Sequence, residues 1–475
     1  MGLLALCGAL LVALACVDGA QVSKVAVLHR HGARTSFQIV DGAFQCSYPY
    51  CELTPEGIYQ SRSVGKYLVD HYGATLGLSA QYNVSQIHSE STAVSRVSKS
   101  ASAALMAMYQ GSEALPYVKT VPLTSDEKMS PWTSIPAWLL SNRNKNVTLR
   151  VSTMVTQLAT PGNIAYLEVY YGLQGQCEAN PLLCVSLAND QVMCNTTSGA
   201  PIDPPIAAML PQLQAAIAYY LSSLAGYFPE EDPMSAAIGS YGLPWVQEVV
   251  SFFQGTTFPD VAVAHYAAHD WTLTSILAAL GTLNVTNRQD PSTIPRFAAT
   301  ILLEYYTDGK VKVLYGAPGQ TPATSYTLTM NPLWVRCANL DGAYWSETGC
   351  PLEALQMGAQ LTAGTSNLNT CYYTPDIMSS AQCSTSNQSS NPACTFFRQK
   401  CPNVPCGGIG RAIPDPARGY ACQPMGKYVT EAAPYVVGTM LAVILPSLLL
   451  GGLIGGCGWR QWKSYSTKKS TTPVN

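Results

Sequence analysis

Two arginines flank a histidine in the segment Arg30-His31-Gly32-Ala33-Arg34, part of the polar turn His29–Thr35 that follows the apolar run Val25-Ala26-Val27-Leu28. A guanidinium group stays charged at every useful pH, and its planar shape matches pairs of phosphate oxygens. Gly32 would let the backbone approach a ligand closely. A short basic turn is more often a solvated loop, but its place after a buried strand favours a phosphate site.

Two later segments have the same arrangement of a strand, a polar turn and a helix. Ser89–Thr92 follows the weaker strand pattern Tyr82–Ile87 and leads into an Ala-rich helix that we expect to end near Gln110. Arg96 falls in the first turn of that helix, after the candidate N-caps Ser91 and Thr92. The free N–H groups and the dipole at a helix N-terminus favour a phosphate there.

The third segment places a carboxyl group beside an imidazole. His265–Asp270 follows the apolar run Val261–Ala264, and a helix is expected from about Trp271 to Leu280. A carboxylic acid can supply the proton that the leaving alkoxide of a phosphate ester needs. The pair His269-Asp270 is compatible with a buried structural pair, yet its place after a third strand makes it a candidate proton donor.

Strands that alternate with helices predict an α/β fold with a central, mostly parallel sheet flanked by helices. In such sheets ligands bind outside the carboxyl ends of the strands, where the three polar segments should meet. Residues from about 120 to 255 contain long helical patterns, notably Ile206–Leu224 with Pro211 inside it, and predict a mainly helical cap over the sheet.

The polar segments resemble the motifs of the histidine acid phosphatases, a branch of the histidine phosphatase superfamily. The resemblance covers about residues 21–355. The matching stretches occur in the expected order: Arg30–Arg34 (RHGxR), Leu53–Gly57 (LTxxG), Ser91-Thr92, Arg96 and Ser100-Ala101 (ST...R...SA), His269-Asp270 (HD), Glu304-Tyr305-Tyr306, and Cys337 with Cys350-Pro351-Leu352.

The resemblance implies a phosphoglycerate-mutase-like fold and an acid phosphatase that forms a phosphohistidine and needs no metal or cofactor. It implies these roles: His31 as the nucleophile; Arg30, Arg34, Arg96 and His269 as ligands of the phosphoryl oxygens; and Asp270 as the acid that protonates the leaving oxygen and then activates water. The expected substrates are phosphate monoesters of small molecules or of phosphoproteins. An acid optimum follows if Asp270 must be protonated, since an unperturbed aspartic acid has a pKa of about 3.9.

Several positions depart from the family pattern. Ser36 follows Thr35 where the signature usually closes with proline, which would change the stiffness of the turn. Ala93 and Ser95 replace residues that are commonly acidic, and Glu90 stands where a basic residue is frequent. These differences bear on substrate preference more than on the mechanism.

Three alternatives stay open. His29-x-His31 and His265-x3-His269-Asp270 have spacings that can ligate zinc or a metal pair, which would make a metal-dependent phosphohydrolase. A phytase of the same family typically carries His-Ala-Glu where this chain has His269-Asp270. A catalytically silent surface receptor or adhesin could keep the fold without the reaction.

Both ends of the chain carry membrane-targeting patterns. Leu3–Val17 reads as the apolar part of a signal peptide in residues 1–19. Tyr435–Gly458 lacks charge and as a helix would span about 36 Å, enough for a ~30 Å hydrocarbon core. We therefore expect a single-pass type I protein of an endosomal-lysosomal membrane or the cell surface. Its parts would be a catalytic domain at 20–358, a Cys/Ser/Thr-rich stalk at 359–430, a transmembrane helix at 435–458 and a cytoplasmic tail at 459–475.

Composition agrees with a lumenal or extracellular body. Thirteen of the 16 cysteines lie outside the signal and the anchor, which argues for disulfides. Because thirteen is odd, one thiol stays free or pairs between chains, which would allow a homodimer. Sequons at Asn83, Asn146, Asn195, Asn284 and Asn387 predict glycosylation. Charged residues make up 11% and the net charge is -2, so the chain offers no support for nucleic-acid binding.

Overall fold

The computed structural model of the chain describes residues 19–40, 43–46, 50–123, 126, 128–130, 153, 155, 160–173, 175–226, 240–282, 294–364, 410–413 and 421–424. The expected transmembrane helix and cytoplasmic tail lie outside these residues, as do nearly all of the expected signal peptide and most of the stalk. None of the helices in the described ranges has the length and apolar character to cross a membrane.

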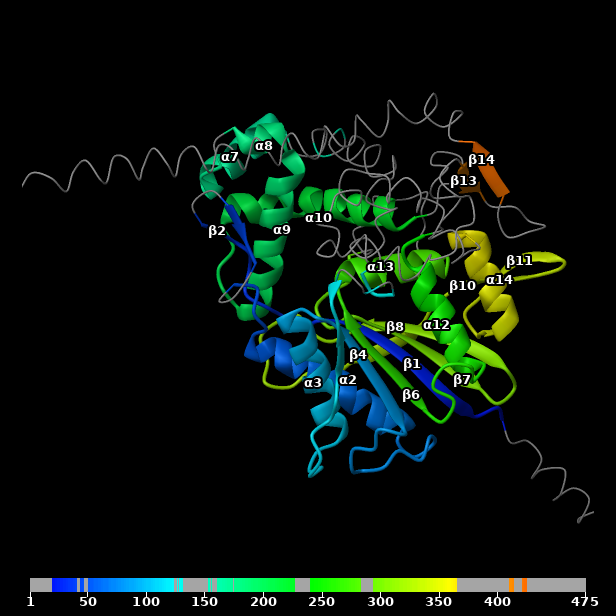
Figure 1. Cartoon of the computed structure of the whole chain (residues 1–475). Coiled ribbons are helices and arrows are strands. Elements are labelled where there is room, and N and C mark those ends of the chain that lie inside the picture. Colours follow the sequence, from blue (N-terminus) through cyan, green and yellow to red (C-terminus); the bar gives the residue numbers. More distant parts are fainter. Residues whose placement is uncertain are drawn as a thin grey trace, which may run out of the picture.

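A mixed α/β architecture is confirmed (Figure 1). The strands are β1 (Val22–Arg30), β2 (Gln38–Val40), β3 (Ala43–Gln45), β4 (Ile87–Thr92), β5 (Lys119–Val121), β6 (Val263–Ala268), β7 (Thr300–Tyr306), β8 (Lys310–Ala317), β9 (Thr329–Pro332), β10 (Val335–Asn339), β11 (Gly342–Ser346), β12 (Cys350–Pro351), β13 (Gly410–Ile413) and β14 (Ala421–Pro424). The helices are α2 (Pro55–Tyr72), α3 (Ser95–Met108), α7 (Pro161–Tyr171), α8 (Gln176–Ala179), α9 (Pro181–Ser198), α10 (Pro204–Ala225), α12 (Leu243–Phe253), α13 (Asp270–Ala279) and α14 (Leu352–Ala363).

Within these residues the central sheet has eight strands, in the order β12-β8-β7-β1-β6-β4-β5, with β9 paired to β8. The expectation of a mostly parallel sheet is wrong for one half. β1, β6, β4 and β5 pair in parallel, whereas β7, β8, β9 and β12 join through antiparallel pairs. The connection from β7 to β8 is only three residues long and turns at Gly309, whose φ is 81°. So short a connection can join only antiparallel neighbours.

The two faces of the sheet are covered by different helices. Along β1, side chains alternate between the faces, as the pleat requires. Val25 and Val27 pack with α2 and α3, whereas Ala26 and Leu28 pack with α12, α13 and α14. The strand is therefore buried on both faces, which explains its continuous apolar run.

Helices α7 to α10 form a second apolar cluster beyond the carboxyl ends of the parallel strands (Figure 1). Helix α10 packs on α13, and Trp271 of α13 contributes to the cluster. Helix α10 continues through Pro211. Helix α12, which lies inside the range expected for the cap, packs instead with the core on the sheet.

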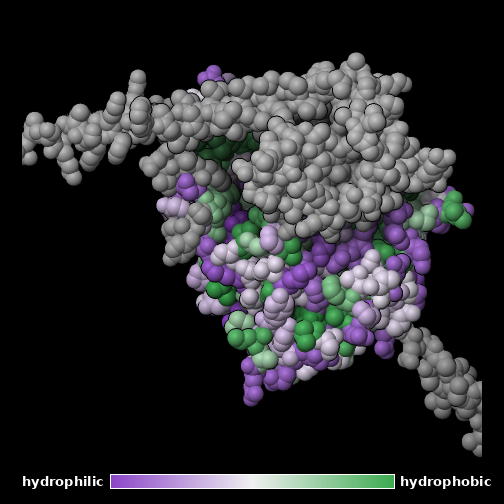
Figure 2. Space-filling view, viewed as in Figure 1, coloured by the Kyte–Doolittle hydropathy of each residue, from purple (hydrophilic) through white to green (hydrophobic). Residues whose placement is uncertain are grey.

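The expectation of disulfides is confirmed. Among the described residues Cys46 pairs with Cys51, Cys177 with Cys184, and Cys337 with Cys350. Cys194 on α9 is a buried free thiol. Of the five sequons, Asn83 lies in a turn and Asn195 lies on α9, where its amide group donates to the carbonyl of Pro201. The other three fall outside the described residues. On the face shown in Figure 2, hydrophilic and hydrophobic residues are interspersed over the described body.

Candidate active site

The carboxyl ends of β1, β4 and β6 meet under the cap at a cavity of about 430 Å³. The sequence-predicted residues all line it: Arg30, His31, Arg34, Arg96, His269 and Asp270. Helix α2 follows β1 onto one face of the sheet, and α13 follows β6 onto the other. Because β1 and β6 are neighbours, their connections diverge and leave a crevice between the strand ends.

The turn after β1 is held by α2 and α3. The N–H of Gly32 donates to Ser100 Oγ (3.0 Å), and the N–H of Ala33 donates to Gln60 Oε1 (2.9 Å). A Cβ atom at residue 32 would lie 2.1 Å from the carbonyl oxygen of Gly57. Glycine is therefore required at residue 32 by the close approach of the α2 backbone, whatever the turn binds.

His31 is neutral, and one of its ring nitrogens is free to attack. Its Nδ1 lies 2.8 Å from the carbonyl oxygen of Gly32, which can only accept, so Nδ1 carries the proton and Nε2 carries the lone pair. Burial lowers the pKa of His31 well below its usual 6.5, and the charges of Arg96, Arg30 and Arg34 lower it further. The side chain is thus an uncharged imidazole among cations.

The three arginines share one feature beyond the cavity. The Nε atoms of Arg30, Arg34 and Arg96 are buried and have no hydrogen-bond partner within the described residues. Buried donors are normally paired, and oxygens of a bound phosphoryl group would pair these. The cavity therefore offers the donors of an anion site.

Asp270 begins α13 and forms an ion pair with Arg30 (Oδ2 to Nη2, 2.8 Å). Its Oδ1 also accepts from the backbone N–H of Trp271 (2.9 Å). Burial alone would raise the pKa of Asp270, but Arg30, His269 and the Trp271 N–H outweigh it, and the pKa lies below its usual 3.8. Asp270 alone therefore favours the carboxylate form, and the expected role as an acid requires a change that raises this pKa.

His269 is oriented by a residue that was expected to cap a helix. Thr92 Oγ1 lies 3.1 Å from His269 Nε2, and Ser91 and Thr92 belong to β4. The N-cap of α3 is Val94, so the expectation that Ser91 and Thr92 cap this helix is wrong. Burial first, then the charge of Arg96, lowers the pKa of His269 to about 3, so its imidazole is uncharged.

Sequence reasoning missed several residues at the pocket. Asp190 on α9 pairs with Arg34, and Phe297 lies under the guanidinium of Arg30, 4.5 Å from its centre. The carbonyl of Pro295 accepts from Arg30 Nη1 (2.7 Å). Phe297 and Pro295 precede an antiparallel strand, so the pattern of parallel strand ends gave no signal for them.

Comparison with known proteins places the chain in a family. The family model described as "Histidine phosphatase superfamily (branch 2)" matches residues 21–316, more than half of the sequence. The chain belongs to the histidine phosphatase superfamily, branch 2. Membership supports a phosphatase activity. A search of curated proteins found no match.

Solved structures of phytases and of an inositol polyphosphate phosphatase resemble it at low identity. The phytase of Klebsiella sp. ASR1 superposes with a TM-score of 0.50 and 13% identity, covering 72% of this chain and 96% of that one. A phytase of Citrobacter braakii gives 0.48 and 13%, with coverages of 72% and 98%. A Bifidobacterium longum multiple inositol polyphosphate phosphatase gives 0.42 and 12%, with coverages of 71% and 88%. At such identities the likeness to the first shows the fold alone.

Of the departures from the superfamily signature, Glu90 now has a structural explanation. Its side chain is fully buried in β4 and pairs with His88 (3.3 Å), Lys119 (3.1 Å) and Lys128 (2.9 Å). Burial would raise the pKa of Glu90, but these partners lower it to about 2. Glu90 lies outside the pocket lining, so it balances the charges of two lysines instead of selecting substrates.

Among the described residues, those whose spacing suggested a metal site do not converge on one point. His29 and His265 face each other across β1 and β6, with their Nε2 atoms 3.1 Å apart. His29 Nδ1 donates to the carbonyl of Arg30, so its Nε2 accepts from His265, whose Nδ1 accepts from Ser89. Within the described ranges no three His, Cys, Asp or Glu residues form a cluster that could hold a metal ion.

The buried histidines predict how stability depends on pH. Burial lowers the pKa of His29 to about 4 and that of His269 to about 3, and those of His31 and His265 lie well below 6.5. As pH falls below about 6.5, these histidines become protonated in the unfolded chain but stay neutral in the folded protein. Each histidine then lowers the free energy of unfolding by up to about 1.4 kcal/mol per pH unit. We expect the melting temperature to fall from pH 7 to pH 5; a constant or rising value would contradict these pKa shifts.

Proposed function

We propose that the chain is an acid phosphatase that hydrolyses phosphate monoesters through a phosphohistidine at His31. The observation that carries the proposal is the unprotonated Nε2 of His31 in a cavity whose three arginines each leave a buried donor unpaired. A neutral nucleophile and fixed cations are what phosphoryl transfer needs, because catalysis rests on positioning and charge stabilisation.

In the first step Nε2 of His31 would attack phosphorus, and the bond from phosphorus to the ester oxygen would break. The Nδ1–H keeps its hydrogen bond to the Gly32 carbonyl and stabilises the cationic phospho-imidazole. Asp270 would give its proton to the leaving alkoxide. In the second step water would attack phosphorus, Asp270 would accept a proton from it, and the phosphorus–nitrogen bond would break to release phosphate.

Asp270 can act as a proton donor only after the substrate has bound. A phosphoryl dianion competes with Asp270 for Arg30 and brings like charge beside the carboxylate, and both effects raise the pKa of Asp270. Proton uptake on binding then favours low pH. An acid optimum follows even though the pKa of Asp270 itself lies below its usual 3.8.

The cap side of the pocket favours an apolar leaving group. Its lining comes largely from aliphatic and aromatic side chains of α9, α10 and α13, which are Leu182, Leu183, Met193, Ile217, Tyr220, Leu221 and Trp271. Among the described lining residues the arginines already named supply all the positive charge. A substrate with one phosphate group fits this surface better than a polyphosphate, which supports a broad acid phosphatase over a phytase.

Replacing Asp270 with asparagine tests the proton transfer. The variant should lose about 10²–10⁴-fold in kcat/KM towards alkyl phosphates, since the alkoxide leaves unprotonated. It should lose much less towards p-nitrophenyl phosphate, whose leaving group needs no acid. Equal losses for both esters would show that Asp270 does not protonate the leaving group.

We also propose that the enzyme is a type I membrane glycoprotein with its catalytic domain in a lumen or outside the cell. The support is the uncharged stretch at 435–458, the cysteine usage and the sequons. Fractionation of cells that make the full chain tests the anchor. Sedimentation with membranes, lost on truncation before residue 435, is expected, and equal solubility of both forms would refute it.

A further inference from the structure

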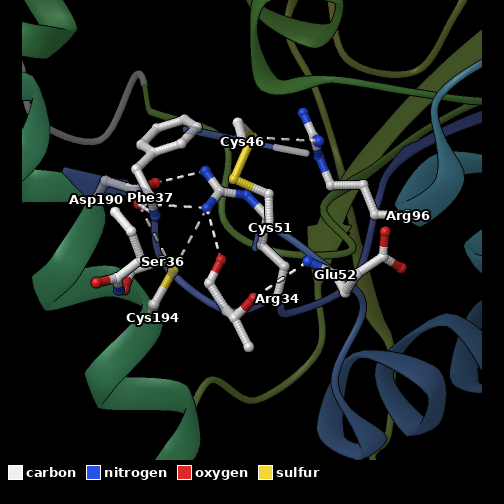
Figure 3. Close-up of a disulfide and its surroundings, with 11 residues drawn as sticks. Arg34, Ser36, Phe37, Cys46, Cys51, Glu52, Arg96, Asp190 and Cys194 are labelled. Atoms are coloured by element: carbon white, nitrogen blue, oxygen red, sulfur yellow. Dashed lines mark hydrogen bonds and ion pairs between the residues drawn. A yellow bond between two sulfur atoms is a disulfide. The ribbon is translucent and has the colours of Figure 1, made fainter. Parts of the chain in front are cut away.

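One carboxylate in the phosphate pocket belongs to neither the signature turn nor the His269-Asp270 pair. Asp190 lies on α9 of the cap, is 8% exposed, and lines the cavity. Figure 3 shows its side chain directed at the guanidinium of Arg34. An anion in an anion-binding pocket weakens the binding of phosphate, so its place there calls for a compensating role.

The hydrogen bonds of Arg34 divide its guanidinium into two edges. Asp190 accepts from Nη1 (3.2 Å) and from Nη2, so it occupies the end of the fork. Nη1 also donates to the carbonyl of Thr35 (3.0 Å). The other edge, formed by Nε and the second hydrogen of Nη2, is left over, and Nε is buried without a partner. A guanidinium held at one edge offers the other as a ready bidentate donor.

Asp190 also fixes the chain beyond the turn. Its Oδ2 accepts from the backbone N–H of Phe37 (3.0 Å), and Cys194, one helical turn along α9, lies 3.7 Å from Arg34 Nη1. Ser36 stands between the two tethered residues, where the backbone lacks the fixed φ that a proline would give. Asp190 thus binds Arg34 before Ser36 and the backbone of Phe37 after it.

We propose that Asp190 is a positioning residue of the phosphate pocket: it holds Arg34 so that Nε and Nη2 face the transferring phosphoryl group, and its charge weakens the binding of the product phosphate. The proposal rests on the proposed phosphatase function. Asp190 and Asp270 each form an ion pair with an arginine of the pocket, which has three, so removing one carboxylate leaves the pocket more cationic. The binding of product phosphate depends mainly on this charge, whereas stabilisation of the transition state also depends on the orientation of Arg34.

The test is Asp190→Asn in the full chain, measured with p-nitrophenyl phosphate as substrate and inorganic phosphate as inhibitor. We expect kcat to fall about 10–100-fold, because Arg34 loses its bidentate clamp. We expect the inhibition constant of phosphate to fall about tenfold, because an opposing charge is gone. Asp190→Glu, which keeps the charge and two acceptor oxygens, should recover much of both values.

A cap carboxylate outside the pocket supplies the matched control. Asp203 accepts from Tyr166 Oη (2.9 Å) in the same helical layer, and Asp203→Asn should leave kcat and phosphate inhibition unchanged. If Asp190→Asn only lowers the melting temperature, with kcat and the inhibition constant at wild-type values, Asp190 is a structural clamp and the proposal fails. Weaker phosphate binding in the variant would overturn it as well.

Calorimetry separates this proposal from the assignment of the reaction. Phosphate binding can be titrated without turnover, in the wild-type chain and in Asp190→Asn. Tighter binding in the variant supports the electrostatic role even if the wild-type protein hydrolyses no ester, which would refute the phosphatase assignment alone. Unchanged binding in a hydrolytically active protein refutes the role of Asp190 alone.

Discussion

His31→Ala should lower kcat about 10⁴-fold or more, the size of effect that follows removal of a nucleophile. In the described pocket, His31 lies among the three arginines. The hydrogen bond of its Nδ1 to the Gly32 carbonyl fixes the tautomer and leaves a lone pair on Nε2 for attack. His269 also lines the cavity, but its Nε2 is engaged with Thr92. Mixing with labelled substrate at acid pH should trap a phosphoryl group on the wild-type chain and none on the variant.

Two controls separate lost chemistry from lost folding. His71 on α2 is exposed and far along the chain from the pocket residues, so His71→Ala should keep full activity. His31→Ala retains the three arginines, so inorganic phosphate should still raise its melting temperature. Label on another residue in the wild-type chain, or undiminished turnover in His31→Ala, would refute the phosphohistidine assignment.

The sequence predicted three of the parallel strands but ended each of them too early. The apolar runs stop at Leu28 and Ala264, whereas β1 continues to Arg30 and β6 to Ala268. Hydrophobicity cannot show that a polar residue is buried with its partners. His29 and His265 share a hydrogen bond across the two strands, so their neutral rings are buried in the sheet with these polar atoms paired.

The pocket was predictable as far as it is built from the ends of parallel strands. His31, Arg96 and Asp270 each follow such a strand, and the pattern of strand, turn and helix places them at one edge. Asp190 and Phe297 come from the cap and from the segment before β7, whose positions depend on tertiary packing that no local spacing encodes. Their contribution became visible only with the three-dimensional contacts.

The arginines differ in how far the protein already satisfies them. Arg30 is paired with Asp270 and Arg34 with Asp190, whereas the one hydrogen bond recorded for the Arg96 guanidinium within the described residues goes to Cys46 Sγ at 3.7 Å (Figure 3). Burial, followed by the charge of Arg34, lowers the pKa of Arg96 to about 10. Its positive charge is therefore disfavoured in the folded protein until an anion binds.

Arg96→Ala should consequently separate activity from stability. We expect kcat/KM to fall about 10²–10³-fold, as on loss of one preorganised donor to a developing charge. The lowered pKa means that the charged form of Arg96 is less stable in the folded protein than in the unfolded chain. Removing this side chain should therefore leave the melting temperature unchanged or higher. The phosphate-induced rise in melting temperature should shrink in the same variant, because the anion loses its least committed partner.

Arg62 provides the comparison, as an exposed arginine on α2 that lies outside the pocket lining. Arg62→Ala should change neither kcat/KM nor the phosphate-induced shift. If Arg96→Ala melts several degrees lower and keeps its activity, Arg96 serves the fold and not the phosphoryl group. Donors that are kept unpaired for the transition state are also unpaired in the free enzyme. Preorganised charge in an active site therefore lowers the stability of the folded protein.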